Sequence, residues 1–222
     1  MGVTKRIVRK MQGRCVAGRE LTDNGPGPWI RPVSARPTEE VSEEERRYEN
    51  ASDPRVLDII DVPLLEPRPK DYQQENWLLD PDCYWEKRGT LAWADLATLR
   101  DGRGPLWING FHSYNGLNDR ILLAQANALG SSLKLIHVGQ LEFRVFKPGE
   151  AFGNPKRRVQ GQFSYAGTDY WLWVTDPIIE RQYLAEPDGE YAAGEAYLTI
   201  SLGEPYQDHC HKLIATVIGR AG

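Results

Sequence analysis

The feature that most constrains the fold is a series of short β-patterns that begins at residue 133. Five segments of β-like sequence follow one another within about 86 residues, and turn signals rich in Gly, Pro and Asp separate them. The segments are LKLIHVGQLEFRVF, RRVQGQFSY, DYWLWVTDP, EAYLTISLGEP and CHKLIATVI. Short strands at this spacing are typical of a small barrel or sandwich, and five strands match the count of an OB-fold barrel.

A second β-rich region occupies residues 1–66. Three short strands are expected within residues 5–34, where the turn TDNGPGP excludes a helix, and RVLDIIDVPLL is the strongest strand of this half. The acidic stretch 37–54 predicts a solvated loop or a short helix. We therefore expect an N-terminal OB-like β-module over residues 1–66.

The stretch between these regions, residues 67–132, predicts a helical connector. YQQENWLLD, TLAWADLATLRDG and LNDRILLAQANALGSS space their apolar residues by three and four, with Asn118 or Asp119 as a candidate cap and Gly130 as the end. The predicted fold class is therefore mainly β with an α connector. Two OB-like small β-barrels would pack around a helical linker region, the second barrel over residues 133–222.

The overall composition indicates a globular protein and argues against a wholly charge-driven nucleic-acid binder, while it leaves room for a local basic patch. The chain has a formal net charge of −4, with 41% hydrophobic and 26% charged residues. Three scattered cysteines do not form a disulfide framework. No apolar run approaches the roughly 18–20 residues of a membrane span, and no signal peptide is recognisable. These features favour a cytoplasmic location.

The hairpin RRVQGQFSYAGTDYWLWVTDP, residues 157–177, carries large aromatic residues on both faces. One face is a candidate core, with Val159, Phe163, Tyr165, Tyr170, Leu172 and Val174. The other face combines amides, a cation and two indoles, namely Arg158, Gln160, Gln162, Trp171 and Trp173. Such a mixture is typical of an OB-type platform, where aromatic rings stack on bases and Arg contacts phosphate. In the alternative interpretation, connector helices cover Trp171 and Trp173, which then belong to an interdomain core.

Basic residues gather in the first 36 residues. Eight Lys and Arg residues face only two acidic ones there, which gives +6 in a chain that is acidic overall. The asymmetry predicts either a cationic groove on the first barrel, with Arg14, Arg19 and Arg31 as candidates, or an ordinary soluble surface. Alternation spreads the charges of residues 5–10 over both faces, which weakens the groove interpretation.

Motifs of known chemistry are scarce. The sequence has no Walker loop and no GxSxG elbow. The glycine-rich stretch 101–116 precedes Asn118 and Asp119, and it could present backbone N–H groups to an anion or serve only as a connector. DHCH at 208–211 supplies two imidazoles on one strand face, which is too few ligands for zinc. We expect no catalytic residue, no metal and no cofactor.

Several phrases occur along the chain in a characteristic order. They are KRIV, GRCVAGREL, WIRPVS, VLDIIDVPL, YQQENWLLD, NGLNDRI, VTDP and SLGEPYQDHCHKLIATVI. Together they resemble the bacterial dual OB-containing domain family over nearly the whole chain, although HCHKLIA stands where CYKLIA is expected. The resemblance implies two OB-like halves, a role in binding nucleic acid or nucleotides, and an association with phage-defence gene neighbourhoods. It implies no catalytic mechanism.

The leading hypothesis is a non-catalytic binding module for single-stranded nucleic acid or a nucleotide. Its expected contact residues are Arg14, Arg19, Arg31, Asn118, Asp119, Arg158, Trp171 and Trp173. Two alternatives remain open. One is an adaptor whose exposed aromatic residues bind an operon-encoded protein partner. The other is an enzyme that acts on a nucleotide or nucleic acid through His112 with Asn118 and Asp119. No membrane contact is expected, and the sequence does not indicate an oligomeric state.

Overall fold

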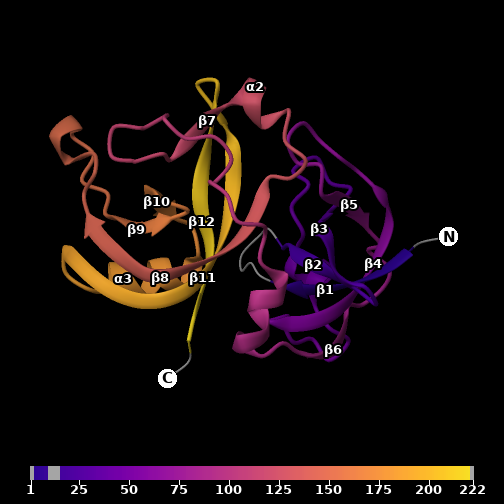
Figure 1. The fold of residues 1–222 in the computed structure, drawn as a ribbon. Coiled ribbons are helices and arrows are strands. Elements are labelled where there is room, and N and C mark those ends of the chain that lie inside the picture. The colour runs from indigo at the N-terminus through magenta and orange to yellow at the C-terminus, as the bar shows by residue number, and fades with distance from the viewer. Residues whose placement is uncertain (1–2, 10–15, 221–222) are drawn as a thin grey trace. The chain divides into compact units, whose positions relative to one another are not determined.

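The structure, a computed structural model, describes residues 3–9 and 16–220 and consists of two compact units (Figure 1). The first unit comprises Met1–Leu99 and Leu129–Ser132, and the second comprises Arg100–Ala128 and Leu133–Gly222. Each unit is built on one six-stranded sheet. Within the described part of the chain, no helix combines the length and apolar character needed to cross a membrane.

The first unit contains a closed ring of five strands. The strands are β1 (Val3–Arg9), β2 (Gly18–Thr22), β3 (Gly25–Val33), β4 (Asp58–Pro67) and β5 (Asn76–Leu79). They pair in the order β1-β2-β3-β5-β4, and β4 returns to pair with β1. Only the β3–β5 contact in this ring is parallel. The one-turn helix α1 (Glu43–Arg46) lies between β3 and β4 in sequence. β6 (Glu86–Thr90) pairs with the first four residues of β4, Asp58 to Asp61.

The second unit repeats this order with longer strands. Its strands are β8 (Leu133–Phe146), β9 (Arg158–Tyr165), β10 (Thr168–Val174), β11 (Gly189–Tyr206) and β12 (His209–Gly219). They pair as β8-β9-β10-β12-β11, with β11 beside β8, and again the third and fifth strands are parallel. Helix α3 (Pro177–Leu184) follows the third strand, as α1 does in the first unit. The predictions of a mainly β chain and of two OB-like modules are therefore confirmed.

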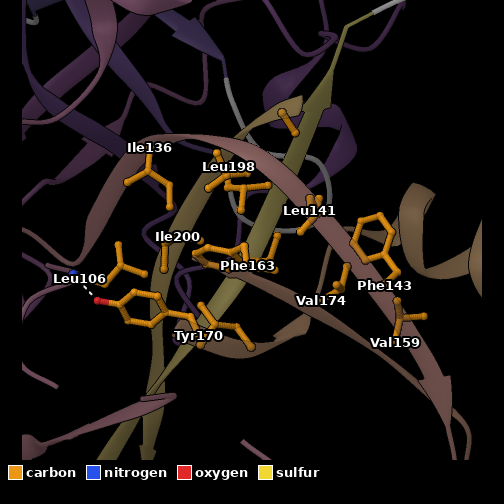
Figure 2. Packing of buried hydrophobic residues seen from close by; sticks show 14 of the residues in the cluster. Leu106, Ile136, Leu141, Phe143, Val159, Phe163, Tyr170, Val174, Leu198 and Ile200 are labelled. Atoms are coloured by element: carbon orange, nitrogen blue, oxygen red, sulfur yellow. Dashed lines mark hydrogen bonds between the residues drawn. The ribbon is translucent and has the colours of Figure 1, made fainter. Parts of the chain in front are cut away.

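Alternation of side chains along the hairpin places its predicted apolar face in the core of the second unit. Figure 2 shows Phe143, Val159, Phe163 and Tyr170 packed with residues of β11 and β12. Gly161 occupies the same face, and a Cβ there would lie 2.3 Å from the Ile214 side chain. A side chain at the centre of β9 would therefore require the end of the Ile214 side chain to move.

The predicted helical connector over residues 67–132 is wrong. YQQENWLLD contains strand β5, which closes the first ring, and TLAWADLATLRDG contains only the 3-10 helix η1 (Trp93–Leu99). The third segment forms the short strand β7 (Arg120–Leu122), which pairs with β12, and one turn of helix, α2 (Leu123–Ala126). Asn118 has a φ of 51°, in the left-handed region, so it cannot begin a helix here. Strand pairing has overridden a weak local helical pattern.

Candidate functional site

The β9–β10 hairpin positions the two indoles that the sequence singled out. Trp171 lies opposite Gln162 and Trp173 lies opposite Gln160, so all four side chains share the face away from the core. β8 extends this surface, because Glu142 and Arg144 lie opposite Gln162 and Gln160. Gln160 is fully buried beneath the Asn115 carbonyl to which it donates. We call the accessible surface the β9–β10 face; it comprises Glu142, Arg144, Phe146, Arg158, Gln162, Trp171 and Trp173.

Two stacked aromatic rings lie between two arginines on this face. The Arg144 guanidinium carbon lies 4.3 Å from the Phe146 ring centroid, and Phe146 stacks on Trp173 at 5.9 Å between ring centroids. The Arg158 guanidinium carbon lies 4.5 Å from the centroid of Trp173. We call these four residues the cation–aromatic ladder. Each contact fits the geometry of a cation–π or stacking interaction, so the ladder is preorganised.

The two predicted tryptophans differ in exposure. Trp171 exposes 39% of its surface, whereas Trp173 is half-buried within the ladder. Neither ring belongs to the buried cluster of the second unit. Trp171 therefore lies open at the surface, whereas Trp173 lies beneath Arg158.

Two further aromatic rings flank the basic end of the face. Phe152 lies in the β8–β9 loop, within the 3-10 helix η2 (Glu150–Phe152), and Tyr114 lies in the glycine-rich stretch. They meet edge to face at 5.4 Å between centroids and remain 72% and 80% exposed. Together with Lys156 and Arg158 they line a hollow of about 470 Å³. In OB-folds the second and third strands and the loop between the first two strands form the ligand surface, which is where these residues lie.

The stretch that carries Tyr114 is fixed to the barrel by direct contacts. Leu117 exchanges two backbone hydrogen bonds with Trp171, and the Gln160 side-chain amide donates to the Asn115 carbonyl at 2.6 Å. The buried Lys212 ammonium donates to the Ile108 carbonyl at 2.8 Å. Burial lowers the pKa of Lys212 to about 7, and the nearby Asp119 only partly offsets this effect.

Asn118 and Asp119 are buried and hold the glycine-rich stretch in place. The Asn118 side chain accepts from the Gly110 N–H and donates to the Asp169 carbonyl. Asp119 accepts from the backbone N–H of Ser113 at 2.7 Å and from its hydroxyl. Burial alone would raise the pKa of Asp119, but the neighbouring His211 and the bonds from Ser113 outweigh it and lower the pKa. Both residues act as internal supports of the loop.

Two of the basic candidates of the first unit make their contacts within that unit. Arg31 is buried and pairs with Glu75 at 2.9 Å, and it also donates to the Ser132 hydroxyl at 2.8 Å. The Arg19 guanidinium lies 5.7 Å from the ring centroid of the buried Trp29. Arg14 lies outside the described residues. The structure thus brings together Arg158, Trp171 and Trp173 from the predicted set.

Sequence reasoning missed several members of the surface. Arg144 and Phe146 alternate with buried residues along β8. The period-2 pattern therefore identifies them as surface residues once the buried face of the strand is known. Phe152 lies in KPGEAFGNP, one of the turn signals between the predicted strands, and Lys156 follows it directly. The signal that could have found them is the OB-fold rule that the first loop borders the ligand surface.

Comparison with known proteins supports this architecture. The family model described as the dual OB-containing domain matches residues 7–217 of the chain. A search of curated proteins and a search of solved structures returned no match. The matched region includes nearly all strands of both rings, each of which has the same strand order. The chain therefore belongs to the dual OB-containing domain family.

Proposed function

We propose that the protein is a non-catalytic binding module for single-stranded nucleic acid, with the β9–β10 face as its contact surface. The observation that carries the proposal is the cation–aromatic ladder beside the exposed Trp171. Membership of an OB-containing family supports a binding role in general, and the chemistry of this face supports the class of ligand.

The cations of the face are suited to phosphate. Arg144, Lys156 and Arg158 form no ion pair with a carboxylate in the part of the chain that the structure describes. By contrast, Lys147 pairs with Glu150 and Arg157 pairs with Asp188. A guanidinium held against an aromatic ring keeps its N–H donors directed outward along the ring plane, where they can bond a phosphate oxygen.

The aromatic rings favour a single strand over a duplex. Trp171, Phe152 and Tyr114 expose ring surface, and each stacked base contributes roughly 1–3 kcal/mol. Bases in a duplex are already stacked on one another, so they are not free to stack on protein side chains. A free nucleotide would use one ring and one cation of the same surface, and its smaller contact predicts weaker binding.

The enzyme hypothesis loses its candidate residues to structural roles. The His112 ring accepts from the Asn118 backbone N–H at 2.8 Å, and Asn118 and Asp119 are buried in the contacts described above. Groups engaged in this way hold a loop and do not converge on a shared open site. This observation supports a binding role without chemistry.

Fluorescence anisotropy with labelled mixed-sequence DNA and RNA strands of about 20 nucleotides tests the proposal. We expect binding at low salt that weakens steeply as salt rises, because phosphate contacts release counterions. Trp171→Ala should weaken binding by roughly 5- to 150-fold, equivalent to about 1–3 kcal/mol. Arg158→Glu should weaken it and reduce the salt slope by at least about 1.

Matched variants on other surfaces serve as controls. Arg181→Glu reverses an exposed charge on α3, and Tyr84→Ala removes a ring that is 50% exposed in the first unit. Both should bind as the unmodified protein does. Absence of binding to either type of strand at low salt would refute the proposal. Salt-independent capture of a protein through Tyr114 and Phe152, without nucleic acid, would favour the adaptor function instead.

A further inference from the structure

A hollow of about 500 Å³ opens on the β9–β10 face beside Trp171, at the end away from the basic loop. We call it the Trp171 groove; its polar lining is Gln140, Glu142, Gln162, Ser164 and Asp169. The strand register places Gln162 directly between Glu142 and Trp171. Since neighbouring strands lie about 4.8 Å apart, a flat ring stacked on Trp171 would have its edge over Gln162 and near a carboxylate.

The charged groups of the groove lining are both hydrogen-bond acceptors, the carboxylates of Glu142 and Asp169. The Ser164 hydroxyl donates to Asp169, so this donor is already used. The Gln162 amide donates one N–H to Gln160 at 3.2 Å, so Gln162 offers its carbonyl oxygen and one further N–H, and Gln140 adds a second amide. Glu142 is exposed and forms no ion pair with a described residue. No Lys or Arg belongs to the lining.

We propose that the Trp171 groove selects bases that carry an exocyclic amino group, and guanine above the others. This inference rests on the proposed function and specifies its substrate class. Guanine presents its N1–H and its amino group side by side, which matches the two oxygens of one carboxylate. Cytosine and adenine each present one amino group, whereas the carbonyl groups of uracil and thymine would face the acidic oxygens.

The distribution of charge on the β9–β10 face also determines how a bound nucleic-acid strand would lie on it. Arg144, Arg158 and Lys156 lie toward the β8–β9 loop, whereas Glu142 and Asp169 belong to the groove lining. Phosphates are attracted to the first part and repelled from the second. The backbone therefore follows the cation–aromatic ladder while a base enters the groove, so the carboxylates meet a base edge and not a phosphate.

Fluorescence anisotropy with a 12-nucleotide oligothymidylate and with the same strand carrying two central guanines tests this selectivity. We expect the guanine strand to bind about tenfold more tightly, at the lower end of what a bidentate base contact contributes. Inosine at the same positions lacks only the amino group, so it should lie between the two. Cytosine should also bind more tightly than thymine.

Substitutions test whether the preference for guanine depends on the carboxylates of Glu142 and Asp169. The double substitution Glu142→Gln and Asp169→Asn should bring the guanine-to-thymine ratio close to one and leave the affinity for oligothymidylate equal or higher. Glu66→Gln, an exposed position on β4 of the first unit, should keep the ratio. Equal affinities of the unmodified protein, or a ratio that survives the double substitution, would overturn the inference but not the proposed function. Failure to bind every strand would overturn both.

Discussion

The two units share one strand order but use their charged residues differently. In the first unit, cations neutralise buried carboxylates: Arg31 pairs with Glu75, Lys87 with Asp58, and Arg88 with Asp61. In the second, Arg144 and Arg158 lie over aromatic rings, and neither pairs with a carboxylate of the described chain. Strand order alone therefore does not distinguish the two units; the side chains on the second and third strands do, and our proposal of a ligand surface on the second unit rests on them.

Among the substitutions considered, breaking a buried ion pair of the first unit should lower the free energy of unfolding most. Arg31→Leu leaves Glu75, whose side chain is 2% exposed, without its cation. We expect the free energy of unfolding of the first unit to fall by about 3–5 kcal/mol. Hydrogen exchange followed by mass spectrometry on peptides from β3 and β5 measures this effect separately from the second unit.

Two further variants make this test decisive. Arg158→Leu removes an arginine that has no such partner, so it should change the stability of the second unit by less than about 1 kcal/mol. Replacing Arg31 and Glu75 together by Leu should recover much of the loss, because no charge is then left buried alone. A small effect of Arg31→Leu would show that the first unit does not depend on its internal pairs.

The second prediction concerns pH. The fifth strand of the first unit begins with a neutral buried residue, Asn76, whereas the fifth strand of the second unit buries Lys212. The pKa of Lys212 falls from 10.5 in the unfolded chain to about 7 in the folded one. Between these values the unfolded state binds more protons, so the free energy of unfolding rises with pH, by up to about 1.4 kcal/mol per pH unit.

Urea unfolding of the unmodified protein and of Lys212→Met between pH 6 and pH 10 measures this contribution. The difference in the free energy of unfolding between the two proteins should be constant below pH 7 and should change steadily above it. Because the slope is the measured quantity, a general loss of stability in the variant does not affect the result. Parallel curves over the whole range would mean that the Lys212 ammonium is not destabilised by burial.

The fold was predictable from the sequence where strands are long and alternate regularly. The five strands of the second unit and the two faces of its hairpin were assigned because period-2 alternation places residues on opposite faces without knowledge of tertiary contacts. The short strands β5 and β7 were not assigned, since each is defined by a partner far away in sequence. Helix α3 is absent from the prediction, although Asp176 and Pro177 form a recognisable helix start, in which Asp176 accepts from the N–H groups of Ile178 and Ile179.

The candidate site was predictable only in part, for a related reason. Alternation identified Arg158, Trp171 and Trp173, which lie on neighbouring strands of one hairpin. It could not show that Arg31 forms a buried ion pair with Glu75, which is 44 positions away in the chain. It also could not place Tyr114 beside Phe152, because two irregular segments meet there and neither has a periodic pattern.

The smallest predicted effect concerns the turns of the two equivalent hairpins. The β9–β10 turn has positive φ at both central residues, 49° at Ala166 and 75° at Gly167, as a type I′ turn requires. Alanine is strained there because its Cβ approaches the carbonyl oxygen, whereas Asn adopts this conformation more readily. Ala166→Asn should therefore raise the free energy of unfolding by roughly 0.5–1 kcal/mol, measured by urea unfolding.

At the β2–β3 turn the reverse change can be tested, in which a residue suited to a positive φ is replaced by alanine. There only Gly25 has a positive φ, 109°, and a Cβ at this position would meet no atom within 4 Å. Gly25→Ala should lower the free energy of unfolding by about 1 kcal/mol through backbone strain alone, since no steric clash contributes. If Ala166→Asn has no stabilising effect while Gly25→Ala destabilises, the strain at Ala166 is relieved by its surroundings. The two hairpins would then differ in how tightly their turns are held as well as in the chemistry of their faces.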